Sequence, residues 1–145
     1  MIWLMWLVDE VGGCTITNDN LNGYVNDWVG GNTNPGGCGH ISVWDVSNVT
    51  SLYGIFCGST DRWASSACSE SKKNFNADIS SWNVAKVTSL RDAFYEASSF
   101  NGNLSSWNVA KVTDLIATFQ QARDFNGDLS SWTVASVATL MATVY

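Results

Sequence analysis

The amino-acid sequence predicts an α/β fold: a solenoid of about four 25-residue coils, each a strand followed by a short helix, with a parallel sheet on one face and an N-terminal helical cap. Two observations predict it. The run Ser-Ser-Trp-Asn-Val-Ala-Lys-Val-Thr stands at residues 80–88 and again, unchanged, at residues 105–113. Within this period, the apolar spacing changes from two residues to three and four. A fixed period of about 20–50 residues is typical of repeats that bury their apolar side only against their neighbours.

Residues 1–39 precede the repeats and are expected to form an apolar segment and the helical cap. Apolar residues stand three, one and three positions apart behind Asn18-Asp19-Asn20, which predicts an amphipathic helix over about residues 19–29. Its apolar face would consist of Leu21, Tyr24, Val25 and Trp28.

The first eight residues, Met1 to Val8, are all apolar. They are too short to span a bilayer, which takes about 20 residues, and they lack the basic start and small-residue cleavage site of a signal peptide. Three interpretations stay open. The segment plugs the first coil, or it is the remnant of an upstream leader or membrane segment, or it docks on a partner through Trp3 and Trp6.

Residues 40–145 hold the repeats, with coils that begin near residues 40, 75, 100 and 125. The alternation in Trp82-Asn83-Val84 predicts a strand, and the spacing of Leu90, Phe94 and Ala97 predicts a short helix over residues 88–97. A strand and a short helix within one such period is the layout of a leucine-rich-repeat-like coil. The recurring aromatic residues are expected in the core: Trp44, Trp82, Trp107, Trp132, Phe56, Phe94 and Phe119. The recurring Asn76, Asn101 and Asn126 are expected to form an amide ladder between coils.

The regular repeat is interrupted at two places. The interval from Trp44 to Trp82 is longer than that from Trp82 to Trp107, so extra residues are inserted within residues 57–73. Such insertions map to loops that often bind, which makes Arg62 and Trp63 candidates for partner contacts. The chain stops at Tyr145 in the middle of a coil without a polar cap. We therefore expect a longer chain or a partner to cover the last coil, with Tyr145 as a further contact candidate.

The four cysteines, Cys14, Cys38, Cys57 and Cys68, all precede the regular repeats. None forms the short paired spacing of a zinc site, and two disulfides are favoured over free thiols or a metal site. Pairing Cys14 with Cys38 and Cys57 with Cys68 is one of three possible arrangements. Disulfides would imply an oxidising compartment.

The composition argues against nucleic acid as a partner. The formal charge is −6 and the seven basic residues are scattered, whereas phosphate binding needs a basic surface. Charged residues make up 14% of the chain, well below the typical share of about 25%, so we expect a neutral surface rich in hydroxyl and amide groups.

No catalytic constellation is evident, and the chain is expected to be neither an enzyme nor a carrier of a cofactor or metal. His40 is the single histidine, and the nearby Asp45 is interpreted as turn chemistry. Asn103 interrupts the column of Asp78 and Asp128, so a stacked carboxylate pair or a calcium ladder lacks continuity.

The repeated residues resemble the bacterial-surface-protein-type repeat of BspA-like proteins and mycoplasma-type surface lipoproteins. That pattern reads roughly Phe-Asn-x-Asp-Ile/Leu-Ser-x-Trp-Asp/Asn-Val-Ser-x-Val-Thr-Asp-Met and ends in Met-Phe. Residues 75–94 and 100–119 fit it closely, and the resemblance covers about residues 15–145. Ala85-Lys86 and Ala110-Lys111 depart from its Ser-x. The resemblance implies a leucine-rich-repeat-like solenoid, secreted or on the cell surface, that binds proteins or matrix without common catalytic residues.

The sequence therefore predicts a non-catalytic module that contacts other proteins, as a surface protein or an assembly subunit. The alternative is a binder of a repetitive non-protein surface, polysaccharide or ice, through the pairs Ser80-Ser81, Ser105-Ser106 and Ser130-Ser131. The expected location is secreted, at the cell surface or in an organelle lumen. Membrane association is expected only through Met1–Val8 or a missing upstream segment.

Overall fold

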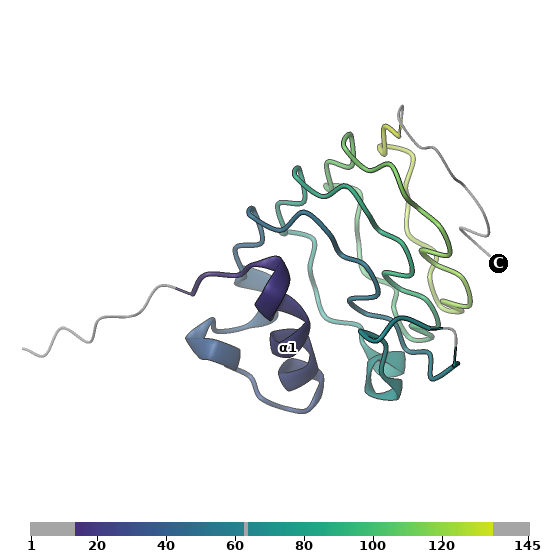
Figure 1. The fold of residues 1–145 in the computed structure, drawn as a ribbon. Coiled ribbons are helices and arrows are strands. Elements are labelled where there is room, and N and C mark those ends of the chain that lie inside the picture. The colour runs from purple at the N-terminus through teal and green to yellow at the C-terminus, as the bar shows by residue number, and fades with distance from the viewer. Residues whose placement is uncertain (1–13, 63, 135–145) are drawn as a thin grey trace, which may run out of the picture.

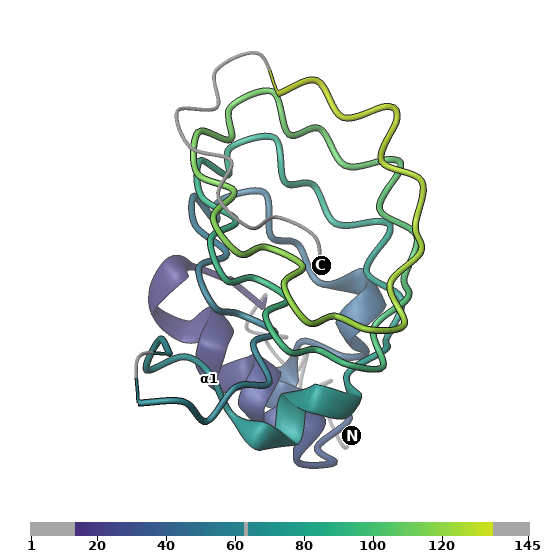
Figure 2. The same cartoon turned by 90° about the vertical axis from the view of Figure 1, so that its right-hand side faces the viewer.

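The computed structural model describes residues 14–62 and 64–134. One α-helix, α1 (Asn18–Val29), is followed by three short 3₁₀ helices, η1 (Pro35–Gly37), η2 (Ile41–Val43) and η3 (Glu70–Asn74). Over residues 40–62 and 64–134 the chain winds in turns that lie one above the next, and α1 stands beside the first of them (Figures 1 and 2). We call residues 40–74 the first coil, 75–99 the second, 100–124 the third, and 125–134 the described part of the fourth.

The predicted leucine-rich-repeat-like α/β solenoid with a parallel sheet is wrong. In residues 14–62 and 64–134 there is no β-strand, and neighbouring coils share only two isolated parallel bridges, Ser51 to Ser89 and Ser89 to Asp114. Residues 82–84 are not in a strand and residues 88–97 are not helical. The N-terminal helix expected over residues 19–29 is present as α1.

Alternate backbone N–H groups explain why neither a strand nor a helix forms. In the second coil, every other N–H donates to a carbonyl of the third coil at 2.9 Å; the pairs are Leu90 to Asp114, Asp92 to Ile116, Phe94 to Thr118 and Glu96 to Gln120. The N–H groups between them instead close tight turns within the coil, as from Ala93 to Leu90. A strand would send none of its N–H groups into local turns, and a helix would send none to a neighbouring coil.

The backbone angles of the same segment also exclude both elements. Asp92 and Glu96 have φ of 53° and 55°, and Ala117 and Gln121, at the same positions of the third coil, have 53° and 59°. These values lie in the left-handed region, which neither strands nor right-handed helices use and which costs about 1–2 kcal/mol per residue outside glycine. The apolar spacing of three and four residues therefore arises from successive turns.

Aromatic rings fill the interior of the coils in repeated positions. Phe94 stacks between Phe56 and Phe119, with ring centroids 5.2 and 5.3 Å apart. In the later coils, the indole N–H of the repeated Trp donates to the preceding coil: Trp82 to the Ile41 carbonyl at 2.9 Å and Trp107 to the Ile79 carbonyl at 3.1 Å. Trp44, Trp82, Trp107, Phe56, Phe94 and Phe119 are buried, and Trp132 is half-buried. All of these rings contribute apolar burial, and those of Trp82, Trp107 and Trp132 add a hydrogen bond between coils.

Asn18, the first residue of α1, takes the place of a preceding coil. Thr88 and Thr113 donate their backbone N–H to the carbonyl of the corresponding Thr one coil earlier, at 2.8 Å each. Thr50 has no such coil before it, and its N–H donates to Asn18 Oδ1 at 3.0 Å. Asn18 Nδ2 also donates to Thr50 Oγ1 at 2.8 Å. A side-chain amide therefore supplies the carbonyl that the missing coil would supply.

The inserted residues of the first coil enclose a lysine. Lys72, in η3, is fully buried, and its Nζ donates to Asn22 Oδ1 of α1 at 2.8 Å and to the Ala67 carbonyl at 2.6 Å. No carboxylate of the described residues forms an ion pair with it. Burial of the ammonium group lowers the pKa of Lys72 to about 8.

We expect Asn18→Ala to lower the free energy of unfolding by about 1–2 kcal/mol, because Thr50 loses the bonds that join α1 to the first coil. Urea denaturation followed by circular dichroism measures the change. Asn26→Ala is the matched control, since Asn26 is an exposed residue of the same helix. Equal effects of the two substitutions would contradict the capping role of Asn18.

Trp107→Ala is expected to lower stability by about 3–5 kcal/mol, since it removes a buried ring and the indole bond to Ile79. Tyr53→Ala, which truncates a ring that is 43% exposed, should change stability by less than about 0.5 kcal/mol. Thermal unfolding of the two variants makes the comparison, and an unchanged melting temperature for Trp107→Ala would disprove the core role.

The stability of the protein should rise between about pH 8 and pH 10. In this range the unfolded chain keeps a proton on Lys72, whose ordinary pKa is 10.5, whereas the folded chain loses it near pH 8. Because the unfolded state then binds more protons, the free energy of unfolding increases with pH. The increase from pH 8 to pH 10 should be about 2 kcal/mol. Denaturation at a series of pH values measures this, and Lys72→Met should abolish the rise while Lys73→Met retains it.

Candidate interaction surface

A groove crosses the first three coils along the two parallel bridges. It has a volume of about 360 Å³ and is lined by Ser51, Tyr53, Ser89, Arg91 and Asp114. The bridges hold Ser51, Ser89 and Asp114 in register, so Tyr53 and Arg91 lie side by side two positions further along their coils. The Tyr53 side chain is 43% exposed, and among the large apolar residues described only Val43, at 71%, joins it as exposed.

Arg91 presents its charge to the groove. Its Nε lies 3.7 Å from Asp92 Oδ2, a long contact, and no other described carboxylate forms an ion pair with it. Burial raises the pKa of Asp92, an effect that Arg91 opposes. Asp114 uses Oδ1 to accept the Ile116 N–H at 3.1 Å. The groove therefore combines one exposed ring, one guanidinium and one carboxylate, which are groups suited to recognition.

The repeated serine and threonine hydroxyls are largely engaged in holding the coils together. Ser106 and Ser131 donate to carbonyls of the preceding coil at 2.6 Å each, and Ser81 donates to the Ser42 carbonyl in the same way. Thr88 and Thr113 also donate to the coil before them, at 3.1 and 3.3 Å. Their protons are therefore already used within the protein.

The first Ser of each pair lies in a local turn with an acidic or amide residue. Asp78 Oδ1, Asn103 Oδ1 and Asp128 Oδ1 accept the N–H of Ser80, Ser105 and Ser130 at 2.8–3.0 Å. These bonds favour the charged form, so backbone and side-chain bonds from Ser80 and Ser130 lower the pKa of Asp78 and Asp128. Both carboxylates face solvent in this bonded form.

His40 lies in a turn at the start of the first coil. Its Nδ1 is 2.8 Å from Ser42 Oγ, and its ring packs edge-on against Trp28 with centroids 4.5 Å apart. Asp45 Oδ1 accepts the Ser47 N–H at 2.9 Å. The hydrogen bonds from the Ser47 hydroxyl and from this N–H lower the pKa of the Asp45 carboxyl group. His40 and Ser42 do not line the groove of Tyr53 and Arg91.

The four cysteines form two disulfides, Cys14–Cys38 and Cys57–Cys68, with Cα atoms 4.8 and 4.5 Å apart. The first joins the segment ahead of α1 to the end of η1, and the second closes the insertion. Of the residues considered for partner contacts, Arg62 is exposed in that insertion, while Trp3, Trp6, Trp63 and Tyr145 lie outside the described residues.

The amide ladder joins the second, third and fourth coils. Asn101 N–H donates to Asn76 Oδ1 and Asn126 N–H donates to Asn101 Oδ1, each at 2.9 Å. The side-chain oxygens of Asn76 and Asn101 therefore serve to connect coils. The groove of Tyr53 and Arg91, in contrast, is not marked by any repeated pattern of the sequence. The sequence feature that could have pointed to this groove is the variation at one position of the repeat. That position holds Tyr53 in the first coil, Arg91 in the second and Ile116 in the third.

Stacked coils with a helical cap and two disulfides define a repeat protein whose later coils keep a 25-residue period. The family model described as "Mycoplasma protein of unknown function, DUF285" matches residues 39–145, and the chain belongs to this family. No curated protein and no solved structure matches the chain. The two disulfides and the family are compatible with an extracellular or surface location.

Two negative findings apply to the described residues. No helix there has the length and apolar character needed to cross a membrane. No three side chains of His, Cys, Asp or Glu in that part of the chain lie close enough to hold a metal ion.

Proposed function

We propose that the chain is a non-catalytic module that binds another protein through the groove of Tyr53, Arg91 and Asp114. The observation that carries the proposal is the placement of an exposed tyrosine beside a guanidinium in a concave surface built from three coils. Tyrosine and arginine are enriched among residues that carry most of the binding energy at protein interfaces.

The partner is a protein segment with a carboxylate for Arg91 and a hydrogen-bond donor for Asp114. The terminal nitrogens of Arg91 form no bond to the described residues, so they can bind a carboxylate in the two-pronged way typical of arginine. Tyr53 would supply apolar contact area on one side of this pair. A local charge pair of this kind gives register and specificity more than affinity.

Protein binding is better supported than recognition of polysaccharide or ice across the repeated face. The hydroxyl protons of Ser106, Ser131 and Thr88 already bond to neighbouring coils, which leaves that face with fewer donors for a repetitive ligand. The disulfides and the resemblance to BspA-like surface repeats support a secreted or cell-surface setting, which forms part of the proposal.

The test is to replace Tyr53 with the photo-crosslinking residue p-benzoylphenylalanine, identify the cross-linked polypeptide in the native source, and titrate that purified polypeptide. Tyr53→Ala and Arg91→Ala should each weaken binding by about tenfold or more. Arg123→Ala is the matched control, because Arg123 is an exposed arginine outside the groove, and it should change binding less than about twofold.

Equal effects of Arg91→Ala and Arg123→Ala would overturn the proposed surface. Absence of any cross-linked polypeptide would overturn protein binding at this groove. Size-exclusion chromatography of the mixture then separates two forms of the function, since an assembly subunit would co-elute with its partner and a transient binder would not.

A further inference from the structure

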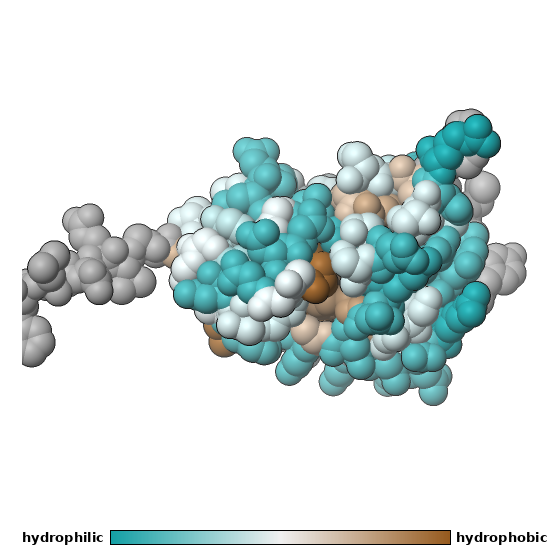
Figure 3. All heavy atoms as spheres, turned by 90° about the horizontal axis from the view of Figure 1, so that it is seen from below, coloured by the Kyte–Doolittle hydropathy of each residue, from teal (hydrophilic) through white to brown (hydrophobic). Residues whose placement is uncertain are grey.

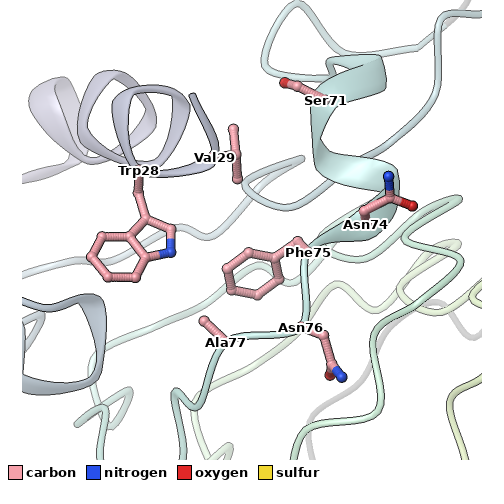
Figure 4. A pocket seen from close by; sticks show the side chains of 7 residues that line it. All are labelled: Trp28, Val29, Ser71, Asn74, Phe75, Asn76 and Ala77. Carbon is pink, nitrogen blue, oxygen red and sulfur yellow. The ribbon is translucent and has the colours of Figure 1, made fainter. Parts of the chain in front are cut away.

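Exposed asparagine side chains recur over the surface of the protein. Hydrophilic residues make up most of the face shown in Figure 3, and two exposed asparagines, Asn74 and Asn76, line a hollow of about 270 Å³ between the end of α1 and η3 (Figure 4). The residues two positions after them, Asn76 and Asp78, carry no hydroxyl group. In the whole sequence, the triplet Asn-x-Ser/Thr begins only at Asn48 and Asn103. This triplet is the acceptor motif for N-linked glycans in surface loops of secreted proteins.

The motif at Asn103 lies on the surface of the third coil. The Asn103 side chain is exposed, and the buried Leu104 anchors the motif to the core. Asn103 Oδ1 accepts the Ser105 N–H at 3.0 Å and the Ser105 hydroxyl at 2.7 Å. The side-chain nitrogen of Asn103 forms no hydrogen bond to a described residue. A glycan attached to that nitrogen therefore extends into solvent and displaces no hydrogen bond of the described chain.

The neighbouring coils hold aspartate where the third coil holds Asn103. The carboxylates of Asp78 and Asp128 each accept the N–H of the serine two positions further on, at 3.0 and 2.8 Å. The turn therefore needs only the acceptor oxygen, which aspartate and asparagine share. The nitrogen of Asn103 is not required for the turn, and it is the atom that an N-linked glycan would occupy.

The motif at Asn48 is held by other parts of the folded chain. Asn48 Oδ1 accepts the Lys86 Nζ of the second coil at 2.9 Å, and Thr50 Oγ1 accepts the side-chain amide of Asn18 at 2.8 Å. A glycan on Asn48 would stand where α1 and the first two coils meet. The side-chain bonds of the motif at Asn103, in contrast, stay within the motif.

We propose that Asn103 carries an N-linked glycan. The inference rests on the secreted or cell-surface setting included in the proposed function, and no residue that lines the groove of Tyr53 and Arg91 belongs to the motif. The donor is an oligosaccharide joined through a diphosphate to a lipid, and a transferase of the secretory compartment uses it. Asn103 Nδ2 bonds to the anomeric carbon of the oligosaccharide. The bond from that carbon to the diphosphate breaks with its electron pair on the diphosphate, and one Nδ2 proton passes to a base of the transferase.

The experiment is to secrete the full chain from cultured eukaryotic cells, where disulfides form and the transferase is present. Peptide-N-glycosidase then converts each glycosylated asparagine to aspartate, and mass spectrometry of proteolytic peptides reads Asn103 separately from Asn48. We expect Asn103 to be glycosylated in most molecules. Ser105→Ala should abolish this glycan, because it removes the hydroxyl of the motif, whereas Ser105→Thr should retain it. Ser106→Ala, at the exposed neighbouring position, is the matched control and should leave the glycan in place.

Asn103→Asp should lose the glycan and still fold, with the melting temperature of the enzymatically deglycosylated chain, because Asp78 and Asp128 form the same turn. The proposal is overturned if Asn103 is unmodified in the folded, secreted chain, if its glycan survives Ser105→Ala, or if Ser105→Ala and Ser106→Ala reduce it equally. None of these outcomes bears on binding at Tyr53 and Arg91, so the two proposals fail independently.

Discussion

Alternate backbone N–H groups that cross from one coil to the next are the interaction on which this structure depends. Gly54 and Phe56 donate to Arg91 and Ala93, and the same pattern continues from the second coil to the third. Because these bonds hold each coil in the same register, the rings of Phe56, Phe94 and Phe119 lie above one another. The bonds also give partners to backbone groups beside an apolar interior, where an unpaired group would be costly.

A stack of this kind has an exposed first layer, and α1 shows how the protein closes it. The side chain of Asn18 supplies the acceptor that Thr50 would otherwise find in an earlier coil. The amide ladder begins only at the second coil, because Cys38 stands in the first coil at the position that Asn76 holds in the second. The groove of Tyr53 and Arg91 lies at a position of the repeat whose residue varies from coil to coil.

Local patterns predict some parts of this molecule well and others poorly. The spacing of Leu21 and Val25 predicts α1, because a helix that covers a core needs that face. The same spacing around Phe94 misleads, since a row of tight turns places apolar residues equally far apart. Left-handed residues in this row are Asp92, Glu96, Ala117 and Gln121, none of them glycine, so the usual marker of such turns is missing. Only Gly54, at the corresponding position of the first coil, hints at it. The groove of Arg91 needs three coils in register, which no single coil reveals.

The order of amino acids alone establishes the 25-residue period, the aromatic positions and four cysteines in a chain poor in charge. These are properties of composition and spacing, and burial of large apolar rings follows from them wherever coils stack. Contacts between coils settle the remainder. Whether an N–H such as that of Leu90 closes its own turn or bonds to Asp114 depends on a neighbour in the next coil. That choice turns an expected sheet into a row of turns whose N–H groups bond alternately within and between coils.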